Sequence, residues 1–125
     1  MALKFLDASG SGDSLDAAAA TVYAADHGAS IANNSWGGGP PEQVLEDAVD
    51  YADAHGMLFV AAAGNDGTNN DASPFYPASY DSDGLVAVAA TDANDSLASF
   101  SNYGAKSVDL AAPGAGILST TRGGG

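Results

Sequence analysis

The chain has 125 residues, 46% of them hydrophobic, which is enough for one domain with a modest core and too apolar for a disordered segment. Its 16 acidic side chains outnumber 3 basic ones, and the net charge of -13 excludes nucleic acid and anionic membrane as partners, because so few cations could neutralise phosphate. The sequence has no cysteine for a disulfide or thiolate metal site, no apolar run of membrane-spanning length, and no signal peptide in this numbering.

The first residues predict a strand, a glycine-rich turn and a helix. Ala2–Leu6 is expected to form a strand, and Asp7–Gly12 a flexible turn. Asp13 is suited to cap the helix that follows, and His27-Gly28 ends it with glycine at the expected position. The apolar residues at helical spacing predict one narrow, alanine-rich buried face, made of Leu15, Ala18, Ala19, Val22 and Tyr23.

A second strand and helix follow in the same order. Ala29–Asn34 predicts a short strand that leads into the glycine-rich turn Ser35–Pro41. Pro41 is placed to begin a helix, Glu42 suits its first turn, and His55-Gly56 ends it. The buried stripe of this helix is predicted to contain Val44, Leu45, Ala48, Val49 and Ala52.

Met57–Ala63 is a run of small and apolar residues that predicts a central strand, buried on both faces of a parallel sheet. The succession β-α-β-α-β, with crossovers this short, requires parallel strands. Asn65, in the Gly64–Gly67 turn, therefore lies just beyond the carboxyl end of a central strand, where ligands bind in open α/β sheets. Its neutral amide could donate to an oxyanion, or it could close the turn through its own backbone, which spacing alone favours.

The remainder of the chain predicts a long loop and three more strands. The loop runs from Gly67 to about Gly84, and loops of this length are functional or disordered. Asp109 lies in the last apolar segment, where an ionised carboxylate needs either a cation or backbone amides as its partner. The three predicted strands are Leu85–Ala90, Ala98–Ser101 and Val108–Ala112.

Neither histidine is predicted to be catalytic. His27 and His55 each occupy the last helical position before a glycine, where imidazolium interacts favourably with the helix dipole and the free carbonyls. The Gly10–Gly12 turn joins a strand to a helix, but the dinucleotide fingerprint needs a glycine where this chain has Leu15. The pattern Gly-x-Ser-x-Gly, which marks a hydrolase nucleophile elbow, does not occur.

Five stretches of the chain, weak singly, form a recognisable set by their order and spacing. They are Gly10–Gly12, Asn33–Gly38, Val60–Asn65, Tyr76–Tyr80, and Ala98–Gly104 through to Ala112–Gly114. Together they resemble the subtilisin-like serine proteases (subtilases, peptidase S8) over nearly the whole chain. The resemblance implies a three-layer α/β/α fold with a mostly parallel sheet, incomplete here, and residues 1–125 as the central part of a peptidase domain.

The resemblance also implies roles for individual residues. Asn65 matches the asparagine that donates to the oxyanion of the tetrahedral intermediate, a contribution of about 3 kcal/mol measured in this same family. Phe75 falls where the floor of the primary specificity pocket is expected, so its ring would restrict the side chain accepted. The residues that match the two substrate-binding edges and one pocket wall are Gly10, Ser11, Gly12, Ser35, Trp36, Gly37, Ala62, Ala63 and Gly64.

A cation site and an environment are implied in the same way. Asp109, with the backbone carbonyls of Pro77, Ala78 and Tyr80, resembles a cation site common in the family, usually occupied by Ca²⁺. The family further implies a polypeptide substrate and a secreted or extracellular protein.

The catalytic triad is missing from the match. Subtilases carry their Asp and His upstream of the first strand seen here and their Ser in a later Gly-Thr-Ser-Met motif, and none of these motifs occurs in the 125 residues. We therefore expect the substrate-binding and oxyanion parts of an endopeptidase, inactive alone and completed by the remainder of the protease domain. The alternative is a non-catalytic peptide-binding or assembly module with the same cleft. An exposed sheet edge would make the chain marginally stable or self-associating.

Overall fold

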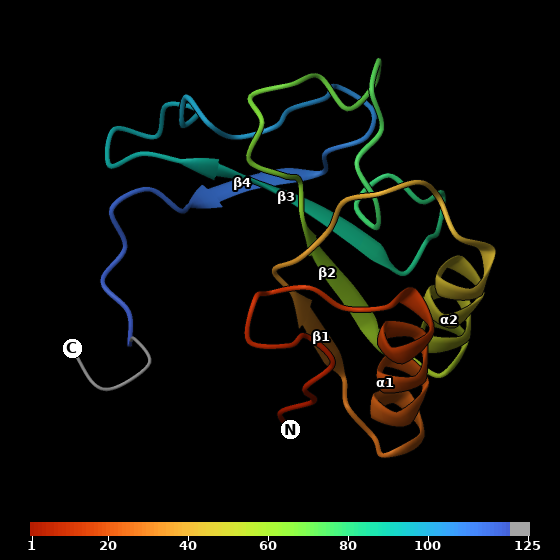
Figure 1. The fold of residues 1–125 in the computed structure, drawn as a ribbon. Coiled ribbons are helices and arrows are strands. Elements are labelled where there is room, and N and C mark those ends of the chain that lie inside the picture. The colour runs from red at the N-terminus through yellow and green to blue at the C-terminus, as the bar shows by residue number, and fades with distance from the viewer. Residues whose placement is uncertain (121–125) are drawn as a thin grey trace.

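The computed structural model describes residues 1–120 as a parallel sheet with two helices on one side (Figure 1). The strands lie in the order β1-β2-β3-β4, and each neighbouring pair is parallel. The elements are α1 (Ser14–Asp26), β1 (Ile31–Asn34), α2 (Gln43–Ala54), β2 (Leu58–Ala62), β3 (Leu85–Thr91) and β4 (Leu110–Pro113). The predicted α/β class and parallel sheet are confirmed, with a helical layer on one face only among residues 1–120.

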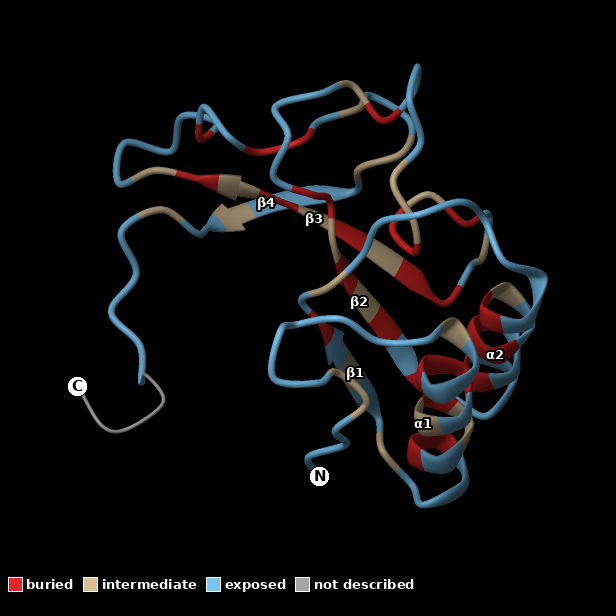
Figure 2. Cartoon of the chain, in the orientation of Figure 1, coloured by how far each residue is buried: buried red, intermediate tan, exposed pale blue. Residues whose placement is uncertain are grey.

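Alternate residues of the central strands form the core. Phe59 and Ala61 of β2 are fully buried and belong to one cluster with Leu45 and Val49 of α2. Full burial of a side chain as large as those of Phe59, Leu45 and Val49 contributes about 1.5–3 kcal/mol to the stability of the fold. Val60, between them, is only half-buried, and Figure 2 shows the same alternation along β3. The prediction that the central strand is buried on both faces is therefore wrong for residues 1–120, because helices cover only one face.

Helix α1 buries a different face from the predicted one. Leu15 and Tyr23 are 63% and 48% exposed, whereas Ala18 is buried as predicted. The apolar pattern of this alanine-rich helix has little contrast, and the face with the smallest side chains is the one that packs on α2. The buried residues are Ala17, Ala18, Thr21, Ala24 and Ala25. The predicted stripe of α2 is confirmed at Leu45, Ala48, Val49 and Ala52, and Val44 is exposed.

The two helices begin in different ways. Asp13 caps α1 as predicted, and its carboxylate accepts a hydrogen bond of 2.7 Å from the N–H of Leu15. Helix α2 begins at Gln43 with Glu42 as its cap, so the expectation that Pro41 opens the helix is wrong. The Tyr80 hydroxyl accepts from the N–H of Glu42 and donates to its carbonyl, at 3.0 and 3.1 Å. This pair of hydrogen bonds holds Glu42 in an extended conformation outside the helix.

Both histidines have the structural role predicted for them. The Nδ1 of His27 lies 2.8 Å from the carbonyl of Tyr23, and the Nδ1 of His55 lies 2.7 Å from that of Tyr51. Because a carbonyl only accepts, each Nδ1 carries a proton. Each imidazole also stacks on the tyrosine whose carbonyl it binds, with ring centroids 3.8 and 4.0 Å apart. Each imidazole therefore packs on the last turn of its own helix.

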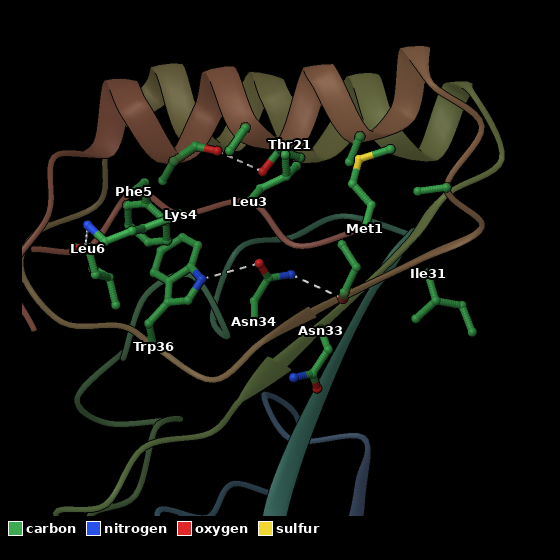
Figure 3. Close-up of a pocket in the computed structure, with 15 residues that line it drawn as sticks. Met1, Leu3, Lys4, Phe5, Leu6, Thr21, Ile31, Asn33, Asn34 and Trp36 are labelled. Atoms are coloured by element: carbon green, nitrogen blue, oxygen red, sulfur yellow. Dashed lines mark hydrogen bonds between the residues drawn. The ribbon is translucent and has the colours of Figure 1, made fainter. Parts of the chain in front are cut away.

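Two predicted strands do not form. Ala2–Leu6 makes no ladder with β1, and a hollow of about 640 Å³ lined by both segments and by α1 separates them (Figure 3). The edge of β1 on that side is consequently unpaired among residues 1–120. Ala98–Ser101 forms turns, since Ser101 donates its N–H to the carbonyl of Ala98. The predicted strands at 85–90 and 108–112 are observed as β3 and β4, shifted by one or two residues.

Candidate functional site

Asn65 lies at the carboxyl end of β2, in the turn that follows the strand. Its side chain is exposed, and none of residues 1–120 hydrogen-bonds to its amide. Gly64, with φ +113°, and Gly67, with φ +64°, allow the backbone to turn away from the strand direction on either side of it. The alternative in which Asn65 closes the turn through its own backbone is not observed in the described part of the chain, where neither its side chain nor its backbone makes a turn hydrogen bond.

A pocket of about 220 Å³ surrounds this turn on the face of the sheet that the helices leave open. Asn65 shares it with Asn33, which lies in β1, and Ser35, which follows that strand; β1 is the neighbour of β2. The Nδ2 of Asn33 donates to the Ser35 hydroxyl at 3.3 Å. The predicted wall residues Ala62, Ala63 and Gly64 line the same pocket. Two sequence-distant turns thus present polar hydrogen-bonding groups to one concave surface.

Phe75 lies between the two turns. A Cβ added at Gly37 would come within 2.5 Å of the Phe75 ring, and one added at Gly64 would lie 3.2 Å from it. The ring therefore occupies the space that the missing side chains of two glycines leave open. The backbone N–H of Phe75 donates to the Ser79 hydroxyl at 3.0 Å, which holds the residue in place.

The Trp36–Gly38 turn faces the Gly10–Gly12 turn across a second pocket, of about 280 Å³. Trp36 itself is half-buried and packs edge-on against Phe5, with ring centroids 4.8 Å apart. Its indole N–H donates to the side chain of Asn34 at 3.2 Å. The two glycine-rich edges predicted from the sequence are therefore brought together, with a groove between them.

The Gly10–Gly12 turn is organised by Asp7, which the sequence reasoning did not single out. One oxygen of its carboxylate accepts from the Ser9 hydroxyl, the Ser9 N–H and the Ser11 N–H at 2.7, 2.8 and 3.0 Å. The Ser9 hydroxyl and these backbone N–H groups hold the pKa of Asp7 below its ordinary value. The spacing Asp-x-Ser is a recognised Asx-turn signal that could have identified this role.

Two buried asparagines behind the Asn65 turn were also missed. Asn70 and Asn102 are each 1% exposed and bond to one another through their side chains at 3.0 Å. Separate turn signals mark both segments, but no sequence periodicity links residues this far apart.

Asp109 and the segment that contains Tyr80 line a third groove, of about 380 Å³. The Asp109 side chain is exposed, and one carboxylate oxygen accepts from the N–H of Ala87 at 2.8 Å. Of the two partners expected for Asp109, a cation or backbone amides, this oxygen therefore has a backbone amide. The Ser82 hydroxyl is buried with no hydrogen-bond partner among residues 1–120 and lines the same groove. No cluster of three histidine, cysteine or acidic side chains suited to a metal ion occurs in the described residues.

Asp71, at the rim of this groove, secures a neighbouring turn. Its carboxylate accepts from the Ser107 hydroxyl and from the N–H groups of Ala105, Lys106 and Ser107, at distances of 2.7 to 3.2 Å. The Ser107 hydroxyl is the largest cause of a pKa of Asp71 that lies below its ordinary value. The carboxylate of Asp71 thus joins the loop after β2 to the segment before β4.

These features define an α/β protein with an open parallel sheet and a polar cleft at the carboxyl ends of its strands, the usual location of a ligand site in this class. No helix among residues 1–120 is both long and apolar enough to cross a membrane.

Comparison with known proteins specifies the class further. The sequence profile of the subtilase family, peptidase S8, matches residues 1–124. The chain is 48% identical over 123 residues to a thermophilic serine proteinase of Bacillus sp. (strain AK1) and 47% identical over 120 residues to thermitase of Thermoactinomyces vulgaris. These matches take in 98% and 96% of this chain but 29% and 41% of the relatives.

Solved structures agree with the sequence match. A cold-adapted subtilisin-like serine proteinase superposes with a TM-score of 0.80 at 37% identity, over 91% of this chain and 40% of that one. The prenylagaramide maturation protease PagA superposes with a TM-score of 0.81 at 32% identity, over 97% of this chain and 44% of that one. The chain belongs to the subtilase family and spans less than half the length of these relatives.

Proposed function

We propose that residues 1–125 form the substrate-binding and oxyanion-stabilising part of a subtilisin-like serine endopeptidase. The observation that carries the proposal is the amide of Asn65, which is exposed in a pocket at the carboxyl end of the central strand β2 and makes no hydrogen bond with residues 1–120. A neutral donor held there by the protein stabilises the negative charge that develops on a carbonyl oxygen during acyl transfer.

The two glycine-rich edges would hold the polypeptide. An extended substrate adds as a strand between Gly10–Gly12 and Ser35–Gly37, where glycine allows another backbone to approach closely. Phe75, between Gly37 and Gly64, forms the floor of the pocket for the substrate side chain and limits its size. The nucleophile and its base come from the rest of the protease domain, because both histidines of this chain lie at helix ends and no Gly-Thr-Ser-Met motif occurs in it.

Covalent labelling with a fluorophosphonate probe tests the division of roles. The 125-residue chain alone is expected to remain unlabelled, and the full-length protein that contains it is expected to be labelled stoichiometrically. Stoichiometric labelling of the short chain would show that it holds its own nucleophile. A non-catalytic peptide-binding or assembly module is the second candidate, supported by a groove that is complete without a triad; it would leave the full-length protein unlabelled while peptides still bind it.

A Ca²⁺ ion fits the groove at Asp109 in its chemistry. One carboxylate oxygen of Asp109 is not used by Ala87, and the buried Ser82 hydroxyl, which has no partner among residues 1–120, is a further hard oxygen ligand. The ion would be held by Asp109 with the carbonyls of Pro77, Ala78 and Tyr80, and would stabilise this part of the fold without taking part in catalysis. Addition of a chelator should lower the melting temperature of the parent protein and leave that of Asp109→Asn unchanged. The family relationship further supports a secreted or extracellular location.

A further inference from the structure

The turn that carries Asn65 lies beyond the end of β2, so its backbone groups cannot be satisfied by the strand ladder. The backbone N–H groups of Asp66 and Thr68 need hydrogen-bond acceptors, and the backbone carbonyl of Gly64 needs a donor. The direction in which the Asn65 amide points depends on how these neighbouring groups are held.

Asn102 supplies all three partners. Its side-chain oxygen accepts from the N–H of Asp66 at 2.8 Å and from the N–H of Thr68 at 3.3 Å. Its backbone N–H donates to the carbonyl of Gly64 at 2.9 Å. Asn102 therefore binds the peptide groups on both sides of Asn65, and it does so from a fully buried position.

Asn70 fixes the orientation of the Asn102 side chain. The Nδ2 of Asn102 donates to the side-chain oxygen of Asn70 at 3.0 Å, and the Nδ2 of Asn70 donates to the carbonyl of Ala63 at 2.8 Å. A flip of either amide would set donor against donor or acceptor against acceptor, so the hydrogen bonds run in one direction only. The same short chain of amides thus joins the residue before Gly64 to those after Asn65.

Ser101 connects this arrangement to the sheet. Its buried hydroxyl accepts from the N–H of Ala90 in β3 at 2.8 Å and donates to the carbonyl of Asn102 at 2.9 Å. Through Ser101, Asn102 is therefore held in a fixed position relative to β3, the strand beside β2.

We propose that Asn102 and Asn70 are positioning residues that aim the Asn65 amide at the oxyanion, an inference that rests on the function proposed above for Asn65. Neither residue reaches the pocket that Asn65 lines, so both act through the turn. Because the amide must meet the charge that develops in the transition state, a displacement of about 1 Å can lower the rate about a hundredfold.

A double-mutant cycle in the full-length protein tests this inference. Asn102→Ala is expected to lower kcat about tenfold to a hundredfold with KM nearly unchanged, because the Asn65 amide acts only in the transition state. In an Asn65→Ala background the same substitution should change kcat by less than about twofold. Val49→Ala, a core substitution in α2 remote from the turn, is the control and should change kcat by the same factor in both backgrounds.

Amide hydrogen exchange gives a readout that does not depend on activity. Exchange at Asp66 and Thr68 should accelerate at least tenfold in Asn102→Ala, while exchange at Phe59 in β2 stays unchanged. Where Asn102→Ala does not fold, Asn70→Ala removes the orienting bond and leaves the acceptor for Asp66 in place. Unchanged kcat, an equal loss in the Asn65→Ala background, or unchanged exchange would each overturn the positioning role. A parent protein that folds but cleaves no peptide would overturn the proposed function instead.

Discussion

The side chains of Asn102 and Asn70 bond to one another at 3.0 Å although 32 residues separate them in the chain. The contact joins the loop that follows β2 to the segment that precedes β4. Because both residues are buried, their amides are protected from water and their hydrogen bonds are correspondingly costly to lose.

Gly64 lies against the Asn102 side chain, and the space there admits no larger residue. Gly64→Ala adds a methyl group that overlaps the Asn102 side-chain amide, at a φ of +113° that already disfavours alanine. We expect a loss of about 2–4 kcal/mol, from backbone strain and the displaced amide together. Gly28→Ala, at φ +76° with open space around the added atom, is the matched control and should cost about 1 kcal/mol. Equal losses in chemical denaturation would contradict the overlap.

Asn65→Ala should remove the oxyanion donor without affecting the fold. Its side chain is exposed and makes no hydrogen bond with residues 1–120, so the melting temperature should stay within experimental error. In the full-length protein kcat should fall about a hundredfold to a thousandfold with little change in KM. A variant that keeps the parent kcat would remove Asn65 from the mechanism.

Under the proposed function, Phe75→Ala should enlarge the space for the substrate side chain. The ring fills the space beside Gly37 and Gly64, and its removal allows a longer or aromatic substrate side chain to enter. We expect kcat/KM for such substrates to rise relative to small ones by about tenfold, the range that differences of one or two methylenes produce. Phe100→Ala, at an exposed position whose ring is not among the nearest neighbours of Gly37 or Gly64, should leave the ranking of a peptide series unaltered.

The hydrogen bonds to Asp71 predict a dependence of stability on acid. Since the pKa of its carboxyl is lower in the folded chain than its ordinary 3.8, its contribution to stability is complete above that value. The contribution is lost as the pH falls through the lower folded value. Asp71→Asn should therefore be less stable than the parent at pH 7, and the two melting temperatures should converge below pH 3.8. Asp50→Asn, on the exposed face of α2, should show no such convergence.

The unpaired edge of β1 predicts self-association of the 125-residue chain. Ile31 is exposed on this edge, and the backbone groups beside it can pair with a second copy. Sedimentation should detect oligomers at moderate salt, where the repulsion due to the net charge of -13 is screened. Ile31→Lys should shift the chain towards monomer, and Val44→Lys on α2 should not. A compact monomer with one cooperative unfolding transition would refute the expectation.

The sequence was sufficient to predict the features that depend on local signals. The α-β-α-β succession of residues 14–62 follows from neighbouring residues, as do the Asp13 cap and both histidine helix ends, and so does the place of Asn65 beyond a strand. Contacts between distant segments were not predictable in this way. No periodicity links Asn70 to Asn102, because polar turn residues carry no pattern of burial.

The remaining errors have the same physical origin. The buried face of α1 depends on which alanines meet α2, and alanine gives almost no amphipathic contrast. Ala2–Leu6 has the composition of a strand, but a strand needs a hydrogen-bonding neighbour, and the hollow beside β1 leaves it without one among residues 1–120. Composition therefore predicted the tendency of these segments but not their partners.

Hydrogen bonds of Asn70 and Asp71 hold the loop after β2 in place before it reaches Phe75. Under the proposed function, sequence changes around Phe75 can alter which substrate side chains are accepted while Asn70 and Asn102 still hold the Asn65 turn. On that proposal, selectivity and rate would change independently in related proteins, because different residues determine each.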